Sequence, residues 1–276
     1  MKSFLRSLLA AAAIALVLAG CATSRVEPDA SARQALAPTG KLRVAVYPGS
    51  PTSMVKDAAS GETRGVTWDL GQKLAAALGV PFEPVVFARP AEVIEGLKAG
   101  KADVTFTNAS PARAKEVDFT PPLLAIEQGF LVPAGSKLTQ AAEVDQSGRR
   151  VGVSAGSTSE GVLTRAAKNL TLVRAATLKE AAEMLSSGRI DAFATNKAIL
   201  SELSDQLPGS RILEGRIGLE NMALGIPKGR EAGMAYLRKF AEQAAADGSL
   251  QRAVARAGVR GTVKPENLKP GEAVQF

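Results

Sequence analysis

A repeated pattern limits the folds that this chain can adopt more than any other feature does. Residues 91–108 and 179–196 align without gaps at an offset of 88 residues. Each copy predicts a helix that ends at a glycine, then a basic residue, an aspartate and a strand that ends in Thr-Asn. The identical pairs include Gly100 and Gly188, Asp103 and Asp191, Thr107 and Thr195, and Asn108 and Asn196. The repeat predicts two related α/β lobes, and the alternative is a chance match of two ordinary αβ units.

The order of the expected elements around the first copy indicates a parallel sheet. Short apolar runs at 42–47, 82–87 and 102–107 alternate with helical faces, one of which is formed by Leu70, Leu74 and Leu78. Strands that alternate with helices of this length are typical of parallel strands joined by crossover helices. In open α/β sheets, ligands bind beyond the carboxyl ends of the strands, where Asn108 and Asn196 both lie. Two facing lobes would therefore direct both asparagines into one cleft.

The amino-acid composition excludes several classes of chemistry. The chain has no histidine and one cysteine, which removes Ser-His-Asp and Cys-His catalysis and the usual zinc and copper sites. We therefore expect no catalytic residue, no metal and no cofactor. The net charge of +7 is scattered along the chain without a basic cluster or interleaved aromatic residues, so we expect no nucleic-acid partner.

The N-terminus predicts export and a lipid anchor. The segment 1–6 carries Lys2 and Arg6 and no acid, residues 8–19 are apolar, and residues 18–21 (LAGC) resemble a bacterial lipobox. We therefore expect a signal peptide at 1–20, a lipid on Cys21 and a flexible linker at 21–40. The protein would then be anchored to a bacterial membrane on its periplasmic or cell-surface side. The alternative is a conventional signal peptide followed by a chance cysteine.

Beyond residue 40, several segments occur in the order found in one known family. They are 41–46 (KLRVAV), 68–70 (WDL), 97–103 (LKAGKAD), 113–120 (an arginine, then VDFT), 151–158 (VGVSAGST), 188–192 (GRIDA) and 247–250 (DGSL). With these segments, the stretch Lys41–Gly261 resembles family 3 of the bacterial extracellular solute-binding proteins, the periplasmic amino-acid receptors of ABC importers.

The resemblance implies a fold and a set of partners. The fold would be a two-lobed clamshell of the type II periplasmic binding proteins, with crossover strands at 130–133 and 224–227. Lobe 1 would comprise 41–129 and 228–262, lobe 2 would comprise 134–223, and 263–276 would form a C-terminal tail. A C-terminal helix containing Leu237 and Phe240 would pack on lobe 1. The protein would be a monomer that binds a small, carboxylate-bearing solute and delivers it to an ABC transporter permease.

Two helix starts are candidates for binding the carboxylate. Ser110 and Pro111 predict an N-cap and first helical position, which places Arg113 in the first turn. A cation there opposes the helix dipole, and the resemblance implies that Arg113 pairs with the ligand carboxylate. Ser157 opens a second helix with capping-box spacing, and the resemblance places another carboxylate contact at Thr158. The alternatives are a solvated surface arginine and a simple helix cap.

The remaining candidate residues leave the ligand open. Amino-acid receptors of this family usually carry an aspartate for the ligand ammonium at the position of Asn196, and asparagine lacks that charge. Thr107 and Asn108 end the first repeated strand, and Tyr47 is the one candidate for an aromatic wall after the strand at 42–47. These residues therefore leave two classes of ligand open, an amino acid and another small organic acid. We expect a binding protein, and the alternatives are an exported dehydratase-like enzyme on the same fold and a ligand sensor that acts through a membrane partner.

Overall fold

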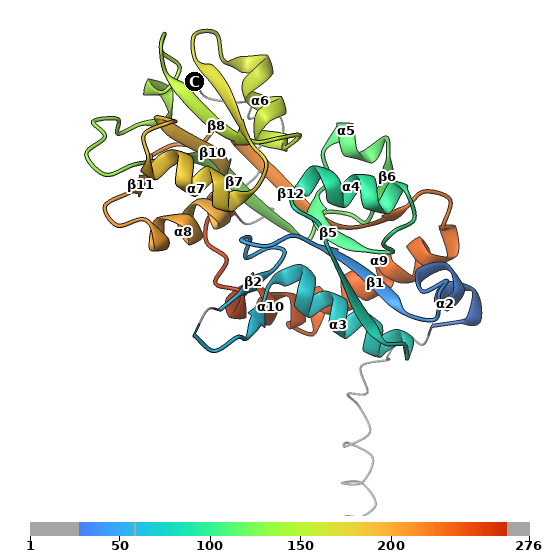
Figure 1. Ribbon diagram of the computed structural model, residues 1–276. Coiled ribbons are helices and arrows are strands. Elements are labelled where there is room, and N and C mark those ends of the chain that lie inside the picture. The colour runs from blue at the N-terminus through green and yellow to red at the C-terminus, as the bar shows by residue number, and fades with distance from the viewer. Residues whose placement is uncertain (1–27, 58, 264–276) are drawn as a thin grey trace, which may run out of the picture.

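The computed structural model describes residues 28–57 and 59–263, which form two α/β lobes joined by two strands (Figure 1). The first lobe contains α2 (Ala30–Leu36), β1 (Leu42–Val46), β2 (Val55–Lys56), β3 (Thr63–Arg64), α3 (Val66–Leu78), β4 (Phe82–Val86), α4 (Pro90–Lys98), β5 (Thr105–Asn108), α5 (Pro111–Ala114) and β6 (Val117–Phe119). The second contains the 3-10 helix η1 (Ala141–Glu143), β8 (Arg150–Ser154), α6 (Thr158–Ala166), β9 (Thr171–Ala175), α7 (Leu178–Ser186), β10 (Ala192–Asn196), α8 (Lys197–Gln206) and β11 (Arg211–Ile212). The joining strands are β7 (Leu124–Val132) and β12 (Gly218–Pro227), and the chain ends with α9 (Glu231–Ala246), α10 (Ser249–Arg256) and β13 (Thr262–Val263).

The internal repeat reappears in three dimensions. In the first lobe β1 lies between β4 and β5, with parallel pairing to β4 and a hydrogen bond from Ala45 N to Val104 O of 2.8 Å. In the second lobe β8 lies in the same way between the parallel strands β9 and β10. The order strand-helix-strand-helix-strand is also the same, with α3 and α4 in one lobe and α6 and α7 in the other. The prediction of two related α/β lobes is thus confirmed.

The two joining strands cross between the lobes at a different place from the one expected. β7 and β12 pair antiparallel with each other from Leu124–Gln128 to Gly218–Met222. Beyond that stretch, Phe130 pairs with Ala194 of the second lobe and Leu224 pairs with Phe106 of the first. The segments 130–133 and 224–227 therefore lie inside the lobe sheets, and the crossing comes five or six residues earlier in each strand. Each strand runs unbroken through both lobe sheets, and no turn within it marks the crossing, so the local sequence does not locate that point.

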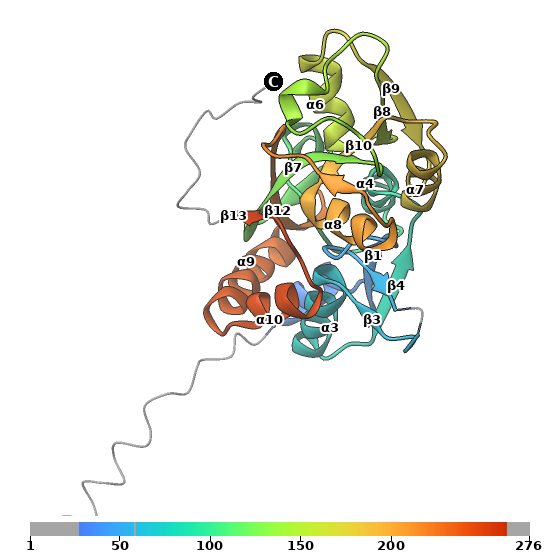
Figure 2. The ribbon, with the colours of Figure 1, turned by 90° about the vertical axis from the view of Figure 1, so that its left-hand side faces the viewer.

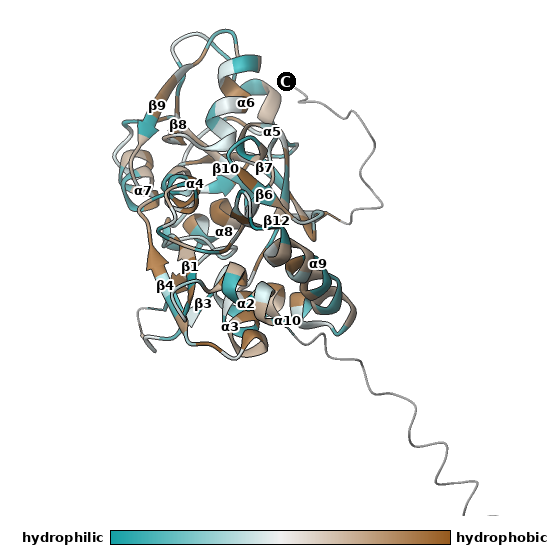
Figure 3. Cartoon of the chain, turned by 90° about the vertical axis from the view of Figure 1, so that its right-hand side faces the viewer, coloured by the Kyte–Doolittle hydropathy of each residue, from teal (hydrophilic) through white to brown (hydrophobic). Residues whose placement is uncertain are grey.

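The C-terminal helices return to the first lobe (Figure 2). The buried face of α9 includes the expected residues Leu237 and Phe240, and it belongs to the same hydrophobic cluster as α3 and β1. Figure 3 shows the apolar and polar residues of α9 on different faces. Of the expected tail 263–276, Val263 pairs with Ala125 of β7, and the rest lies outside the described residues.

Part of the expected linker is folded. The segment 21–40 was expected to be flexible throughout, but Ala30–Leu36 forms α2, which packs against α9. Asp29 caps this helix by accepting a hydrogen bond from Ala32 N at 2.7 Å, and Leu36 is fully buried. Ala32 and Leu36, about one helical turn apart, are the buried residues of this short helix, so packing against α9 supplies most of its stability. Within the described residues, none of the helices has the length and apolar character needed to cross a membrane.

The two lobes touch on both sides of the space between them. A Cβ atom on Gly49 would lie 3.2 Å from the Leu178 side chain, and a Cβ atom on Gly156 would lie 2.7 Å from that of Ala91. Both glycines also have positive φ angles, so a larger residue would be strained as well as crowded. One hydrophobic cluster contains residues of both lobes, Tyr47 and Leu178 among them. The structure therefore shows the lobes packed against each other.

Candidate functional site

Arg113 lies where its helix start predicts. Ser110 caps α5 and accepts a hydrogen bond from Arg113 N at 3.4 Å, and Pro111 occupies the first helical position. The side chain is 9% exposed, and its Nη1 donates to Thr107 Oγ1 at 2.9 Å and to the Asn108 carbonyl at 3.4 Å. Both acceptors are uncharged. Among the described residues, no carboxylate forms an ion pair with this buried guanidinium.

Burial has an electrostatic cost for Arg113. Removal from water lowers the pKa of the guanidinium, while the negative charge of Glu220 acts in the opposite direction. A buried arginine without a carboxylate partner is unfavourable in the empty protein and becomes favourable when an anion binds. Arg113 is therefore the best-supported candidate for binding an anion among the predicted residues.

The start of α6 faces the same space from the second lobe. Ser157 caps this helix and accepts a hydrogen bond from Glu160 N at 3.1 Å. The Glu160 carboxylate accepts a hydrogen bond from Gly156 N at 2.7 Å, which holds the turn before the helix. The spacing of a capping box was thus a correct indication of a helix start, although Glu160 bonds to Gly156 in place of Ser157. The first backbone N–H groups of a helix have no partner within the helix and attract anions.

One cavity of about 460 Å³ brings these groups together. Its lining includes four of the predicted site residues, Arg113 and Asn108 from the first lobe and Ser157 and Thr158 from the second. Gln128 and Asn221 contribute from the crossover strands β7 and β12. The cavity therefore lies between the lobes at the carboxyl ends of repeated strands, as expected for a ligand site in this type of sheet.

The other three predicted residues do not line this cavity. Thr107 holds Arg113 through the hydrogen bond described above. Asn196 caps α8 by accepting from Ile199 N at 3.0 Å, and its Nδ2 donates to Glu220 Oε2 at 2.8 Å. The Tyr47 hydroxyl donates to Ser50 at 3.2 Å in a buried loop, and burial raises the pKa of this phenol. Their direct contact with a ligand stays a prediction.

Two polar residues of this region were missed from the sequence. Gln128 and Glu220 are 1% and 7% exposed, and they lie side by side at the crossing of β7 and β12. Gln128 Nε2 donates to Glu220 Oε1 at 3.1 Å and to Ser159 Oγ at 2.9 Å. Each belongs to a polar pair, Glu127-Gln128 or Glu220-Asn221, that interrupts the apolar residues of its strand, and this interruption is the signal that would have identified them.

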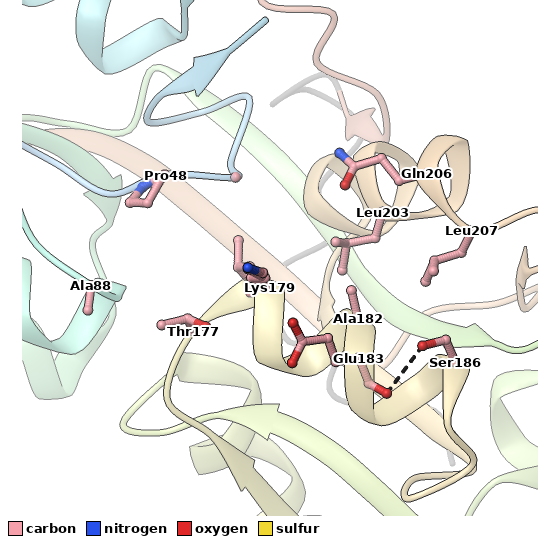
Figure 4. Close-up of a pocket in the computed structure, with 12 residues that line it drawn as sticks. Pro48, Ala88, Thr177, Lys179, Ala182, Glu183, Ser186, Leu203, Gln206 and Leu207 are labelled. Atoms are coloured by element: carbon pink, nitrogen blue, oxygen red, sulfur yellow. Dashed lines mark hydrogen bonds between the residues drawn. The ribbon is translucent and has the colours of Figure 1, made fainter. Parts of the chain in front are cut away.

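A second, slightly larger cavity of about 530 Å³ opens between the loop after β1 and helices α7 and α8 (Figure 4). Two of its polar side chains form hydrogen bonds within α7 itself. Thr177 caps the helix by accepting from Glu180 N at 3.0 Å, and Ser186 donates to the Glu183 carbonyl at 3.2 Å. None of the predicted site residues lines this cavity. It offers an apolar wall without a buried, unpaired charge, and so it is the weaker candidate for a polar solute.

Comparisons with known proteins agree with this arrangement. The model of the bacterial extracellular solute-binding proteins, family 3, matches residues 42–258. The ABC transporter glutamine-binding protein GlnH of Bacillus subtilis (strain 168) is 26% identical over 182 residues. That match covers 64% of this chain and 66% of the relative, just under two thirds of its length.

Solved structures show the same fold. An ancestral arginine-binding protein bound to glutamine superposes with a TM-score of 0.70 at 29% identity, covering 78% of this chain and 96% of that one. The ancestral amino acid-binding protein AncCDT-1, described as a precursor of cyclohexadienyl dehydratase, superposes with a TM-score of 0.70 at 24% identity and covers 81% and 97%. Because the family model spans most of the described residues, the chain belongs to the bacterial extracellular solute-binding proteins of family 3.

Proposed function

We propose that this protein is the solute receptor of an ABC importer and that it captures a small carboxylate-bearing solute, an amino acid or a related acid, between its lobes. One observation carries the proposal. Arg113 is buried beside the inter-lobe cavity and has no ion-pair partner among the described residues. A guanidinium matches a carboxylate with two parallel hydrogen bonds, and the start of α6 offers further N–H donors from the opposite lobe.

The neighbours support the class of ligand. GlnH is named as a glutamine-binding protein of an ABC transporter, and the ancestral arginine-binding protein was solved with glutamine bound. A free amino acid is small enough for a cavity of about 460 Å³. We place the hinge for opening at the paired stretch of β7 and β12, where the chain passes between the lobes.

Native mass spectrometry of the freshly purified protein tests this function directly. We expect a retained solute below a few hundred daltons that carries a carboxylate, and isothermal titration with that solute should show 1:1 binding. Its mass should stay unchanged after prolonged incubation, since a receptor does not turn its ligand over. A chemically altered solute would support the enzyme alternative, and co-purification of a kinase in place of a permease would support the sensor.

We further propose that residues 1–20 are a signal peptide and that Cys21 carries a lipid, both of which lie outside the described residues. Several acyl chains on one cysteine partition into a bilayer by about 0.8 kcal/mol per buried CH₂, enough for firm anchoring. Cys21→Ser should therefore move the protein from the membrane fraction to the soluble fraction or leave it unprocessed, while Ser24→Ala should not. Retention of Cys21→Ser on membranes after a high-salt wash would contradict the lipid anchor.

A further inference from the structure

Glu220 is a buried acid at the back of the cavity. Its Oε1 accepts hydrogen bonds from Thr158 Oγ1 at 2.5 Å and from Gln128 Nε2 at 3.1 Å, and its Oε2 accepts from Asn196 Nδ2 at 2.8 Å. All three donors are uncharged, and no lysine or arginine of the described residues forms an ion pair with it. Thr158 and Gln128 both line the cavity, so the carboxylate lies directly behind its wall.

Glu220 and Arg113 are opposite charges that do not neutralise each other. Both are buried, and the charge of Glu220 acts on the guanidinium of Arg113, yet no ion pair joins them in the described structure. Separate buried charges of opposite sign favour a ligand that is itself dipolar, because such a ligand offers a partner to each. The geometry therefore favours a solute that carries both a carboxylate and a cation.

The contact between Glu220 and Asn196 explains the unusual asparagine. The amide oxygen of Asn196 caps α8, so its nitrogen points to Glu220 and donates to it. An aspartate at 196 would place a second carboxylate against Glu220, and two carboxylates in contact cannot both stay charged at low cost. Asparagine at 196 and glutamate at 220 are thus compatible neighbours. The acidic residue of this pair lies on β12, and the end of β10 carries the uncharged amide.

We propose that Glu220 supplies the negative charge that selects a solute ammonium, so that the ligand is an α-amino acid and its 2-hydroxy acid counterpart is rejected. This inference rests on the proposed receptor function. It assigns the carboxylate of the solute to Arg113 and the start of α6, and the ammonium to the side of the cavity that Glu220 and Asn196 back. Glu220 is thereby a specificity-determining residue on the crossover strand.

Matched ligand pairs test the inference by isothermal titration. The probes are alanine and lactate, leucine and 2-hydroxyisocaproate, phenylalanine and phenyllactate, and glutamate and 2-hydroxyglutarate. We expect the wild-type protein to bind at least one amino acid about thirtyfold or more tightly than its hydroxy acid. Glu220→Gln should lose about thirtyfold or more in affinity for that amino acid and change affinity for the hydroxy acid little.

Two further variants separate charge from structure. The double variant Glu220→Gln with Asn196→Asp keeps a hydrogen bond between the two side chains and moves the negative charge from position 220 to position 196. It should therefore recover most of the preference for the amino acid. Glu127→Gln makes the same chemical change on the adjacent strand, where Glu127 pairs with Lys197 and Arg216, and it should leave the preference intact. Thermal melts identify the variants that fold.

The outcomes are distinct. An equal affinity of the wild-type protein for both members of every pair that binds, or an amino-acid preference that persists in Glu220→Gln, would overturn the role of Glu220 and leave the receptor function standing. A folded double variant without the preference would overturn it too, even if Glu220→Gln alone failed to fold. Absence of binding to either class of probe by the wild-type protein would count against both proposals.

Discussion

Arg113→Ala is expected to weaken solute binding by roughly thirty- to several-thousandfold. Removing one partner of a desolvated, hydrogen-bonded charge pair costs about 2–5 kcal/mol, and each 1.4 kcal/mol is about tenfold in affinity. The structure places this guanidinium beside the inter-lobe cavity, oriented by Thr107 and by the carbonyl of Asn108. Arg113→Lys should also lose much of the affinity, because an ammonium cannot form the planar two-point contact.

Isothermal titration with the retained solute measures the effect, and thermal melts of the empty variants measure the fold. The fold should survive both substitutions, since a cation in the first turn of a helix does not stabilise it. Arg189→Ala is a matched control, because Arg189 is exposed and, within the described part of the chain, its side chain hydrogen-bonds to the neighbouring Ser187 alone. Affinity near the wild-type value in Arg113→Ala would move the anion site to the helix start at Ser157 and Thr158.

Asp103→Ala should lower the free energy of unfolding by about 3–5 kcal/mol. The Asp103 carboxylate is fully buried and accepts hydrogen bonds from two arginines, Arg43 at 2.8 and 2.9 Å and Arg230 at 2.9 Å. It thereby ties β1 to the residue that precedes α9. Its removal would leave two largely buried guanidinium groups without their charge partner.

The internal repeat supplies the control for this prediction. Asp191 occupies the same place in the second lobe and pairs with Arg150 in the same way, but the two side chains are 27% and 45% exposed. Asp191→Ala should therefore cost only about 1 kcal/mol. The midpoint temperature of thermal unfolding should fall by roughly 6–20 °C for Asp103→Ala and by a few degrees for Asp191→Ala. Equal losses would show that burial does not distinguish the two aspartates.

Local patterns were sufficient to predict the α/β class, the repeat and several local features of the candidate site. A helix start depends on neighbouring residues, so Ser110 with Pro111 correctly located the first turn that contains Arg113. The same is true of Ser157 at the start of α6. Strand ends follow from apolar runs and their stop signals, which placed Asn108 at the cavity. The helix that contains Leu237 and Phe240 and returns to the first lobe was implied by the family resemblance.

The tertiary structure decided what depends on residues far apart in the chain. The role proposed for Glu220 depends on Thr158, 62 residues away, and on Gln128, 92 residues away, so no local window contains the network. The crossing of β7 and β12 depends on which sheet each half of a strand joins, and apolar pattern does not encode that choice. Asp103 and Asp191 occupy matching positions of the sequence repeat, yet of the two only Asp103 receives a second arginine, from a segment 127 residues later. The sequence by itself determined the elements and their repeat because these follow from short-range propensity and period. Burial, pairing and electrostatic partners followed only from packing, because they depend on which distant segments come together.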